Sequence, residues 1–347
     1  DDVQDKHNAE KRFSKNPAEK LKNVQGRFGG YWRFPELLDF CYLVNPYFPT
    51  QKMQEEMKIY FHDLLSQYPS GLGVQNILAG KMFGIESENI VVGNGASELI
   101  KGLGRAQNGT FGLVFPTFNE YPESIGYDRI VQHVSNNIDF SYSVDNLLCL
   151  AEKSDNLILI NPDNPSGHFI KNDELIKIAD KLQRMNKMFI LDESFVDFST
   201  NSESESLISQ EILDKYQNLV VIKSISKSYG VPGIRLGILA TSNKDIMTSI
   251  SREVSIWNIN SFGEFFLQII GKYKSDYALG CSNIIQERGR FYKHLEKISY
   301  LDVLPSEANY FLCFVKDKYS ATELSKLLID RYEIYIKDLT GKIGFEG

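Results

Sequence analysis

Residues 219–235 read LVVIKSISKSYGVPGIR, and this stretch decides how the rest of the chain is interpreted. It begins with an apolar, β-type run (219–222) and continues into a serine-rich loop that holds Lys227. Arg235 follows the lysine after 235 − 227 = 8 positions. An amine flanked by hydroxyl groups and a guanidinium suits a Schiff base with pyridoxal 5′-phosphate (PLP), because the neighbouring donors can bind the phosphate. The alternative is a surface lysine in a serine-rich loop.

Outward from this stretch, short apolar runs alternate with helical patterns between about residues 75 and 240. The runs are 89–92, 111–115, 157–160, 188–191, 219–222 and 236–239, and one helical pattern covers 173–182. Near-continuous apolar strands joined by helices predict an α/β fold with a mostly parallel sheet covered on both faces. Polar motifs follow four of these strands, at the edge where ligands bind in such sheets.

The pattern changes after Trp257. A long helical region (261–297), a strand-like stretch (309–315), a helix (321–328) and a strand (334–336) predict a smaller α+β domain. We therefore expect an N-terminal arm or linker at 1–50 that joins the small domain, a large domain at 51–258 and a small domain at 259–347. Residues 1–25 are charged and polar, and they predict a frayed lead-in or a linker from an upstream domain. The start without methionine and the abrupt end suggest a piece of a longer polypeptide with a truncated small domain.

The composition narrows the class of protein. The 347 residues are 42% hydrophobic, which is enough for two packed cores, and the formal net charge of −7 disfavours nucleic acid as a partner. No apolar run approaches the ~18–20 residues that span a bilayer, and we expect a cytoplasmic protein without a membrane partner. The cysteines are widely spaced and the histidines lack metal-ligand spacing, so neither a disulfide framework nor a metal site is predicted.

Asp192 ends a strongly apolar run, where an unpaired carboxylate is costly. A protonated pyridine nitrogen is a suitable partner, and the pair would strengthen the cofactor ring as an electron sink. Glu193 is a rival for this role. A helix N-cap aspartate is the structural alternative.

Residues 95–97 precede a helical pattern, so their backbone N–H groups and the Ser97 hydroxyl form a natural phosphate cradle. A plain helix cap is the alternative. Ser224, Ser226 and Arg235 would add side-chain donors, and the arginine can bind a phosphate through two parallel hydrogen bonds. The donors of this candidate phosphate site are Gly95, Ala96, Ser97, Ser224, Ser226 and Arg235.

Two further residues suit the cofactor ring. Asn164 lies in a loop that two prolines restrain, and its amide can hydrogen-bond the phenolic oxygen of PLP. A structural asparagine turn is the alternative. Phe118 can stack on the ring, although it can equally be a core residue.

In this order and spacing, residues 164–167 (NPSG), Asp192-Glu193 and Ser226-Lys227 with Arg235 resemble the fold-type I PLP enzymes, the aspartate-aminotransferase superfamily, over about residues 28–344. The resemblance implies a seven-stranded, mostly parallel sheet between helices, plus a smaller α+β domain. It also implies that Lys227 is the Schiff-base lysine and proton shuttle, and that Asp192 pairs with the pyridine nitrogen. Asn164, Phe118 and the phosphate donors named above would be cofactor contacts.

The chain resembles most the group of histidinol-phosphate aminotransferases and threonine-phosphate decarboxylases. The matching segments are 28–30 (FGG), 44–47 (VNPY), 192–198 (DESFVDF) and 307–310 (EANY). Tyr68 resembles the tyrosine that reaches the cofactor phosphate of a neighbouring subunit, which implies a homodimer with shared active sites. Three departures stand out. Phe195 replaces a frequent tyrosine, Phe314 replaces an expected arginine, and the family's carboxylate-binding arginine would lie beyond Gly347.

These departures imply weaker binding of a substrate carboxylate, which suggests an amine substrate that carries a different anionic group. The resemblance extends to aminotransferase domains fused behind a nucleotidylyltransferase, and our hypothesis is amino transfer between 2-aminoethylphosphonate and phosphonoacetaldehyde with a keto acid partner. Decarboxylation of a phosphorylated amino acid and a non-catalytic sensor domain are the alternatives, as is histidinol-phosphate amino transfer. Substrate contacts are expected among residues that could equally be packing residues: Tyr31, Trp32, Arg33, Tyr47, Trp257, Asn258 and Asn309.

Overall fold

The computed structural model describes residues 17–42, 44–200 and 205–345. The chain divides into a large unit (44–292 and 304–312) and a small unit made of the remaining segments. This division differs from the predicted boundary after residue 258. The helix α14 (Ser261–Ile269) belongs to the large unit because Phe266, Leu267 and Ile269 are buried in that unit's main apolar core.

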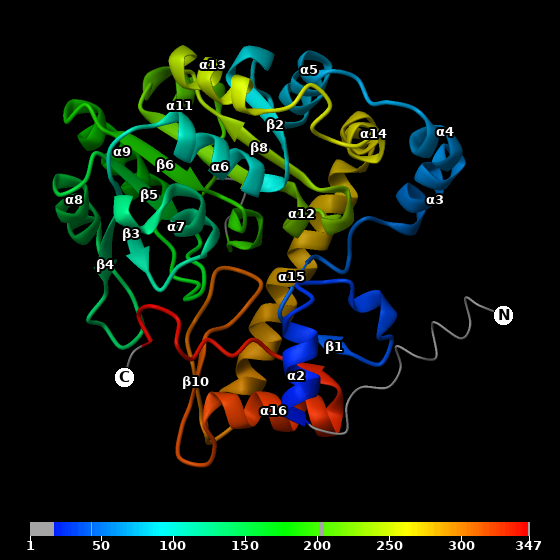
Figure 1. Ribbon diagram of the computed structural model, residues 1–347, viewed down its shortest axis with the longest axis vertical. Coiled ribbons are helices and arrows are strands. Elements are labelled where there is room, and N and C mark those ends of the chain that lie inside the picture. Colours follow the sequence, from blue (N-terminus) through cyan, green and yellow to red (C-terminus); the bar gives the residue numbers. More distant parts are fainter. Residues whose placement is uncertain (1–16, 43, 201–204, 346–347) are drawn as a thin grey trace. The chain divides into compact units, whose positions relative to one another are not determined.

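A seven-stranded sheet forms the centre of the large unit, in the order β2-β8-β7-β6-β5-β3-β4 (Figure 1). All strands run parallel except β8, which is antiparallel to both of its neighbours. This confirms the predicted α/β fold. The strands are β2 (Ile90–Asn94), β3 (Phe111–Phe115), β4 (Ile130–Val134), β5 (Asn156–Ile160), β6 (Met188–Asp192), β7 (Leu219–Ser224) and β8 (Leu236–Ala240).

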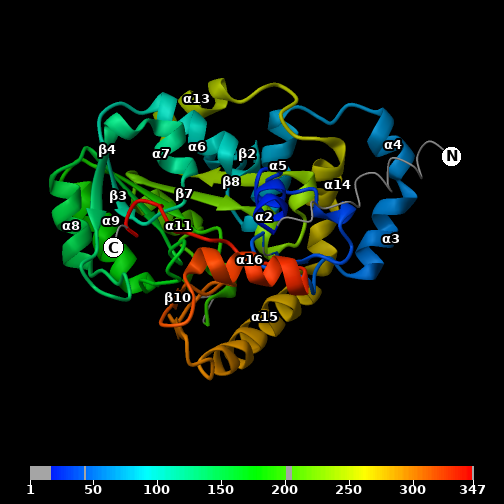
Figure 2. The same cartoon turned by 60° about the horizontal axis from the view of Figure 1, so that its bottom comes forward.

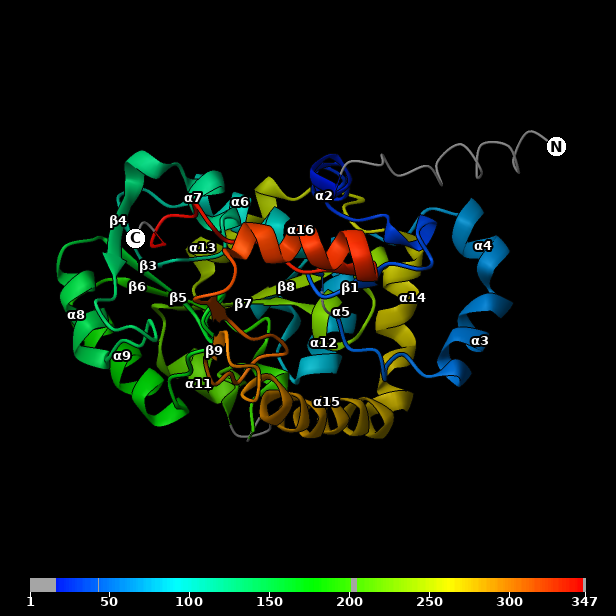
Figure 3. The same cartoon turned by 90° about the horizontal axis from the view of Figure 1, so that it is seen from below.

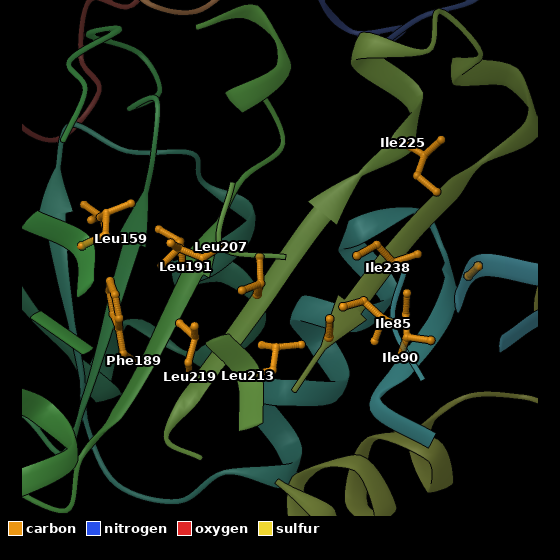
Figure 4. Close-up of a cluster of buried hydrophobic side chains, with 14 of the residues drawn as sticks. Ile85, Ile90, Leu159, Phe189, Leu191, Leu207, Leu213, Leu219, Ile225 and Ile238 are labelled. Carbon is orange, nitrogen blue, oxygen red and sulfur yellow. The ribbon is translucent and has the colours of Figure 1, made fainter. Parts of the chain in front are cut away.

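Helices cover both faces of the sheet, as Figure 3 shows. One face carries α6 (Gly95–Ala106), α7 (Glu120–Ile125) and α13 (Lys244–Glu253), and the other carries α8 (Val144–Glu152), α9 (Asn172–Arg184) and α11 (Gln210–Lys215). Successive strand residues point to opposite faces. Leu191, Leu219 and Ile238 therefore pack with Leu213 of α11 in one apolar core (Figure 4).

The other helices of the large unit flank this layered region. They are α3 (Gln51–Ile59), α4 (Phe61–Ser66), α5 (Leu72–Phe83), α12 (Ile225–Ser228) and the long α15 (Lys274–Leu295), which belongs to this unit up to residue 292. Short 3₁₀ turns are η2 (Ser87–Asn89), η3 (Tyr127–Arg129), η4 (Val196–Phe198), η5 (Pro232–Ile234) and η6 (Ile270–Tyr273).

The small unit is an α+β structure. It contains α2 (Pro17–Gln25), η1 (Tyr31–Arg33), α16 (Ala321–Tyr332) and two strand pairs: β1 (Leu38–Asp39) parallel to β11 (Ile334–Tyr335), and β9 (Leu301–Val303) antiparallel to β10 (Cys313–Val315). The expectation of a frayed lead-in is wrong for residues 17–25. The helix α2 lies beside α16 (Figure 2). Leu21 and Val24 of α2 are buried in one apolar cluster with Ile329 of α16, and each such burial contributes about 1.5–3 kcal/mol. Residues 1–16 lie outside the described residues.

Residues 304–312 are a second correction, because the sequence predicted a strand over 309–315 and only Cys313–Val315 forms one. The segment 304–312 instead belongs to the large unit, where Tyr310 donates its hydroxyl to the Asp163 carbonyl at 2.6 Å. Among the helices of the described residues, none combines the length and apolar character that a membrane span requires.

Candidate active site

The topology gathers the predicted residues at one edge of the sheet. Parallel strands end at a common edge, so the polar segments after β2, β3, β5, β6 and β7 meet there. Because β8 is antiparallel, its first residue lies at the same edge, and Leu236 pairs with Asn94 at the end of β2. The structure thus brings Arg235 beside the start of α6 and close to the end of β7, where Ser224 pairs with Gly237.

Asp192 is the buried acid of this edge. It ends β6 and is 4% exposed. The Tyr121 hydroxyl donates to its Oδ2 at 2.7 Å, and the Ser194 backbone N–H donates to its Oδ1 at 2.9 Å. Burial raises the pKa of Asp192, and the hydrogen bonds from Ser194 and Tyr121 oppose that rise. The carboxylate keeps lone pairs on both oxygens for a further partner.

Glu193 points to the other side of the sheet. Its Oε2 accepts the Ser206 hydroxyl at 2.6 Å and its Oε1 accepts the Leu207 N–H at 2.6 Å. Leu207 belongs to the apolar core shown in Figure 4. Burial raises the pKa of Glu193 to about 7. Of the two neighbouring carboxylates, the geometry therefore favours Asp192 as the partner of the cofactor ring.

An anion-binding pattern surrounds the start of α6. Gly95 has φ 73°, a left-handed conformation that glycine adopts easily, and its N–H donates to the Arg235 carbonyl at 3.0 Å. A Cβ on Gly95 would stand 2.5 Å from Nη2 of Arg235, so the guanidinium lies directly over this turn. Within the described residues that guanidinium has no hydrogen bond or ion pair. Gly237 similarly leaves room for the backbone N of Ala96, which a Cβ would approach to 2.5 Å.

Ser224, three positions before Lys227, connects the ends of β6 and β7. The Ser224 N–H donates to the Ser194 hydroxyl at 2.9 Å, and Ser194 in turn holds Asp192. Ser226 is buried, and its hydroxyl has no hydrogen-bond partner among the described residues. Such an orphaned hydroxyl is costly unless a ligand satisfies it.

Lys227 lies in the one-turn helix α12, directly after β7, and is partly buried. Asn45 fixes the backbone of this helix. Its N–H donates to the Lys227 carbonyl at 3.0 Å and its side-chain amide donates to the Ser228 carbonyl at 3.0 Å. Gly230 ends the turn at φ 62°, where a Cβ would collide with the Phe48 carbonyl. The lysine is thus mounted on a restrained piece of backbone.

The asparagine loop is equally restrained. Beside Asn164, the buried Asp163 accepts the Ser166 hydroxyl at 2.5 Å and the Tyr142 hydroxyl at 3.4 Å. Asn164 itself is partly buried. Phe118 follows β3 and is 39% exposed, with its ring edge-on to Tyr121 at 6.5 Å.

The remaining predicted residues fall into three groups. Tyr68 and Trp257 are exposed and pack against each other at 4.7 Å, and Tyr47 is also exposed. Asn258 is buried and donates to Glu98 and to the Val92 carbonyl, which is the geometry of a packing residue. The residues of the third group are divided between the two units. Tyr31, Trp32, Arg33 and Phe314 belong to the small unit, and Asn309 belongs to the large unit.

The departure at position 195 has a structural setting. Phe195 is buried and meets the ring of Tyr310 edge-on at 5.0 Å, in a cluster with Phe198 and Ala308. Tyr310 directs its hydroxyl to the Asp163 carbonyl. Phe195 is thus held by apolar packing, and it offers no hydroxyl to a ligand.

These residues fit PLP. A buried carboxylate with spare lone pairs suits a ring N–H. The Gly95 turn suits a phosphate, as do the Ser226 hydroxyl and the Arg235 guanidinium, neither of which has a partner among the described residues. Lys227 would supply the amine. The comparisons agree, since the family model for aminotransferase class I and II matches residues 66–341.

The chain belongs to the class I and II aminotransferase family. Members of this family depend on PLP. Over 344 residues the chain is 32% identical to the CMP-5′-(3-aminopropyl)phosphonate synthase of Streptomyces rubellomurinus, covering 99% of this chain and 54% of that protein. It is 30% identical over 334 residues to the L-serine phosphate decarboxylase of Sulfurospirillum multivorans, covering 90% and 84% respectively.

A solved member of the family shows the same fold. The histidinol-phosphate aminotransferase of Clostridium acetobutylicum superposes with a TM-score of 0.78 at 26% identity, covering 89% of this chain and 91% of that one. The chain spans about half the length of the Streptomyces relative.

Sequence reasoning missed three residues of this site: Tyr121, Ser194 and Asn45. A usable signal existed for Tyr121, which lies only three positions after Phe118, in the same polar segment that follows the apolar run 111–115. Ser194 and Asn45 act through backbone hydrogen bonds that depend on the folded chain.

Proposed function

We propose that this chain is a PLP-dependent enzyme that acts on a small amino compound bearing a phosphate or phosphonate group. Removal of a carboxylate is the reaction we place first, and amino transfer is the second candidate. The convergence of Lys227, Asp192 and the Arg235–Gly95 turn at one sheet edge carries the proposal of PLP chemistry. The names of the relatives support the class of substrate.

PLP, when bound, supplies an electron sink for the negative charge that develops at the substrate carbon. Asp192 holds a proton at the ring nitrogen, because its buried charge favours a positively charged partner. Lys227 supplies the amine that binds the cofactor and can then accept or return a proton at the substrate carbon. The start of α6, with Ser226 and Arg235, anchors the phosphate and fixes the orientation of the ring. Asn164 would donate to the phenolic oxygen, and Phe118 would stack on the ring.

The names of the relatives support this order of the two reactions. The sequence motifs alone placed amino transfer of 2-aminoethylphosphonate first. The Sulfurospirillum relative is named a decarboxylase and matches over most of its own length, which favours loss of carbon dioxide. The solved histidinol-phosphate aminotransferase keeps amino transfer as the second candidate, with 2-aminoethylphosphonate as the amine and a keto acid as the acceptor.

The assembly belongs to the same proposal. A homodimer in which Tyr68 reaches the phosphate of the neighbouring subunit would cover the exposed Tyr68–Trp257 pair. We also propose that a nucleotidylyltransferase domain belongs to the same polypeptide and that the protein is cytoplasmic. Half of the Streptomyces relative lies outside the match, which leaves room for such a domain there.

One assay separates the reactions. Purified protein is incubated with PLP and either phosphoserine or 2-amino-4-phosphonobutyrate, without any keto acid. Carbon dioxide and the amine product that has lost the carboxylate are then quantified. Formation of the two in equimolar amounts supports decarboxylation. Conversion of 2-aminoethylphosphonate that requires a keto acid, without carbon dioxide, would instead establish amino transfer.

Lys227→Ala is the matched control for either reaction. It should abolish turnover and the borohydride-reducible attachment of the cofactor. An unchanged reducible attachment in this variant would overturn the proposed role of Lys227, and no turnover with any of these compounds would sink the assigned substrate class.

A further inference from the structure

Two buried tyrosines of the large unit donate a hydrogen bond to a carboxylate. Tyr121 of α7 donates to Oδ2 of Asp192 at 2.7 Å, and Tyr273 of η6 donates to Oε2 of Glu56 at 2.6 Å. Both tyrosines are almost completely buried, at 0% and 3% exposure. The pairs share their chemistry, but only the first involves the carboxylate assigned to the cofactor ring. This difference makes the second pair a natural control.

We propose that Tyr121 is a positioning residue for the cofactor and acts through Asp192, an inference that rests on the proposed function. The Tyr121 hydroxyl holds Oδ2 while the Ser194 N–H holds Oδ1. With one donor on each oxygen, the plane of the carboxylate is fixed. The lone pairs left on both oxygens then face a defined direction. Loss of the hydroxyl frees this group to rotate.

The same hydrogen bond preserves the charge of Asp192. Desolvation favours the protonated carboxyl group, and a donor to the ionised form opposes it. Other groups act on this carboxylate or feel its charge: Lys223 lowers the pKa of Asp192, and the pKa of the partly buried Tyr310 hydroxyl is raised by burial and by the charges of Asp163 and Asp192. Neither donates a hydrogen bond to Asp192 within the described residues, so their effects persist when Tyr121 is changed.

Tyr121→Phe tests the inference, with Tyr273→Phe as the matched control. The cofactor is removed from each purified holoenzyme, and the PLP dissociation constant is measured at pH 8 and pH 6 by absorbance and compared with wild type. A lost hydrogen bond to a charged group weakens binding by about tenfold. In Tyr121→Phe the loss should be larger at pH 6 than at pH 8, because loss of this donor raises the pKa of Asp192 further and favours its protonated form as the pH falls. Tyr273→Phe should match wild type at both pH values.

A second variant guards against misfolding. Asp192→Asn removes the charge, so adding Tyr121→Phe to it should change PLP affinity by less than about twofold, as expected when one partner acts only through the other. Tyr121→Phe with the affinity of Tyr273→Phe at both pH values, or a pH-independent loss, would overturn the inference and leave the proposed function intact. Wild-type protein that fails to bind PLP would overturn both.

Discussion

Asp192 and Glu193 are neighbours in the sequence and both are buried, yet they belong to two different regions of the large unit. Asp192 faces α7, where a tyrosine hydroxyl and one backbone N–H hold it and lone pairs remain. Glu193 lies on the opposite face, where the Ser206 hydroxyl and the Leu207 N–H bind its two oxygens beside the apolar core. Burial alone therefore does not separate a site residue from a structural one.

The groups that surround each carboxylate show what does separate a site residue from a structural one. Around Asp192 the structure gathers groups that invite a ligand, namely the orphaned Ser226 hydroxyl and the Arg235 guanidinium. Around Glu193 it gathers Lys223, which is 3% exposed and pairs with Asp197 at 2.5 Å. Within the described residues, the region around Asp192 thus contains polar and charged groups without partners, whereas Glu193 and the nearby Lys223 both have partners.

The sharpest test of this comparison is to neutralise each carboxylate in turn. Asp192→Asn should lower turnover by about two to three orders of magnitude, because breaking a buried ion pair costs about 3–5 kcal/mol. Glu193→Gln should retain turnover within about threefold, since the amide oxygen can still accept the Leu207 N–H and the Ser206 hydroxyl can rotate to accept from the amide NH2. Steady-state turnover at saturating PLP provides the measurement. Equal losses in the two variants would break the comparison.

The second test concerns stability. Burial raises the pKa of Glu193 from its usual 4.5 to about 7, so between these values the folded chain binds the proton that the unfolded chain releases. The free energy of unfolding should therefore fall as pH rises from 4.5 to 7, by about 3 kcal/mol, and stay level above that. Glu193→Gln should remove this dependence.

Chemical unfolding of the cofactor-free protein at pH 5 and pH 8 measures the effect. Subtracting the Glu193→Gln variant isolates this carboxyl group from Asp192, whose pKa burial also raises. If the free energy of unfolding has the same pH dependence in the wild type and in the variant, Glu193 is ionised throughout. The region around Glu193 would then need another source of stability.

The strands were predictable because their signal is local. Five buried residues in a row, as in Phe111–Phe115, are readable without tertiary context. β4 (Ile130–Val134) was absent from the predicted runs, since an edge strand with a glutamine and a histidine has a weaker apolar pattern. The helix α2 was hidden for a related reason: only Leu21 and Val24 carry its apolar face, and its partner Ile329 lies some 300 positions further on.

The site divides in the same way. Lys227, Asp192 and the Gly95 turn lie in motifs from which their roles could be predicted in sequence. The choice between Asp192 and Glu193 stayed open, because the alternation of strand side chains does not reveal which face holds the ligand. Tyr121 and Asn45 matter through contacts with residues 71 and 182 positions away, which are the separations 192 − 121 and 227 − 45. No motif encodes such a pairing.

The third test extends the comparison to the phosphate end. Arg235→Lys should weaken PLP binding by about tenfold, because lysine keeps the charge but loses the planar two-pronged geometry. Gly95→Ala should act in the same direction, since its Cβ would stand 2.5 Å from Nη2 of Arg235. Arg184→Lys, on an exposed ion pair with Asp180, is the matched control and should leave the PLP dissociation constant unchanged.

The smallest expected effect belongs to the face of the cofactor ring. Phe118→Leu should weaken PLP binding by about fivefold, because aromatic stacking is worth about 0.5–1.5 kcal/mol beyond buried area. Tyr127→Leu is the control: Tyr127 is 45% exposed, close to the 39% of Phe118, but it precedes β4 and so lies at the opposite edge of the sheet. Fluorescence titration of the cofactor-free proteins measures both. If Phe118→Leu binds PLP as tightly as Tyr127→Leu, Phe118 is a packing residue and the ring must find its flat contact elsewhere on the Asp192 side.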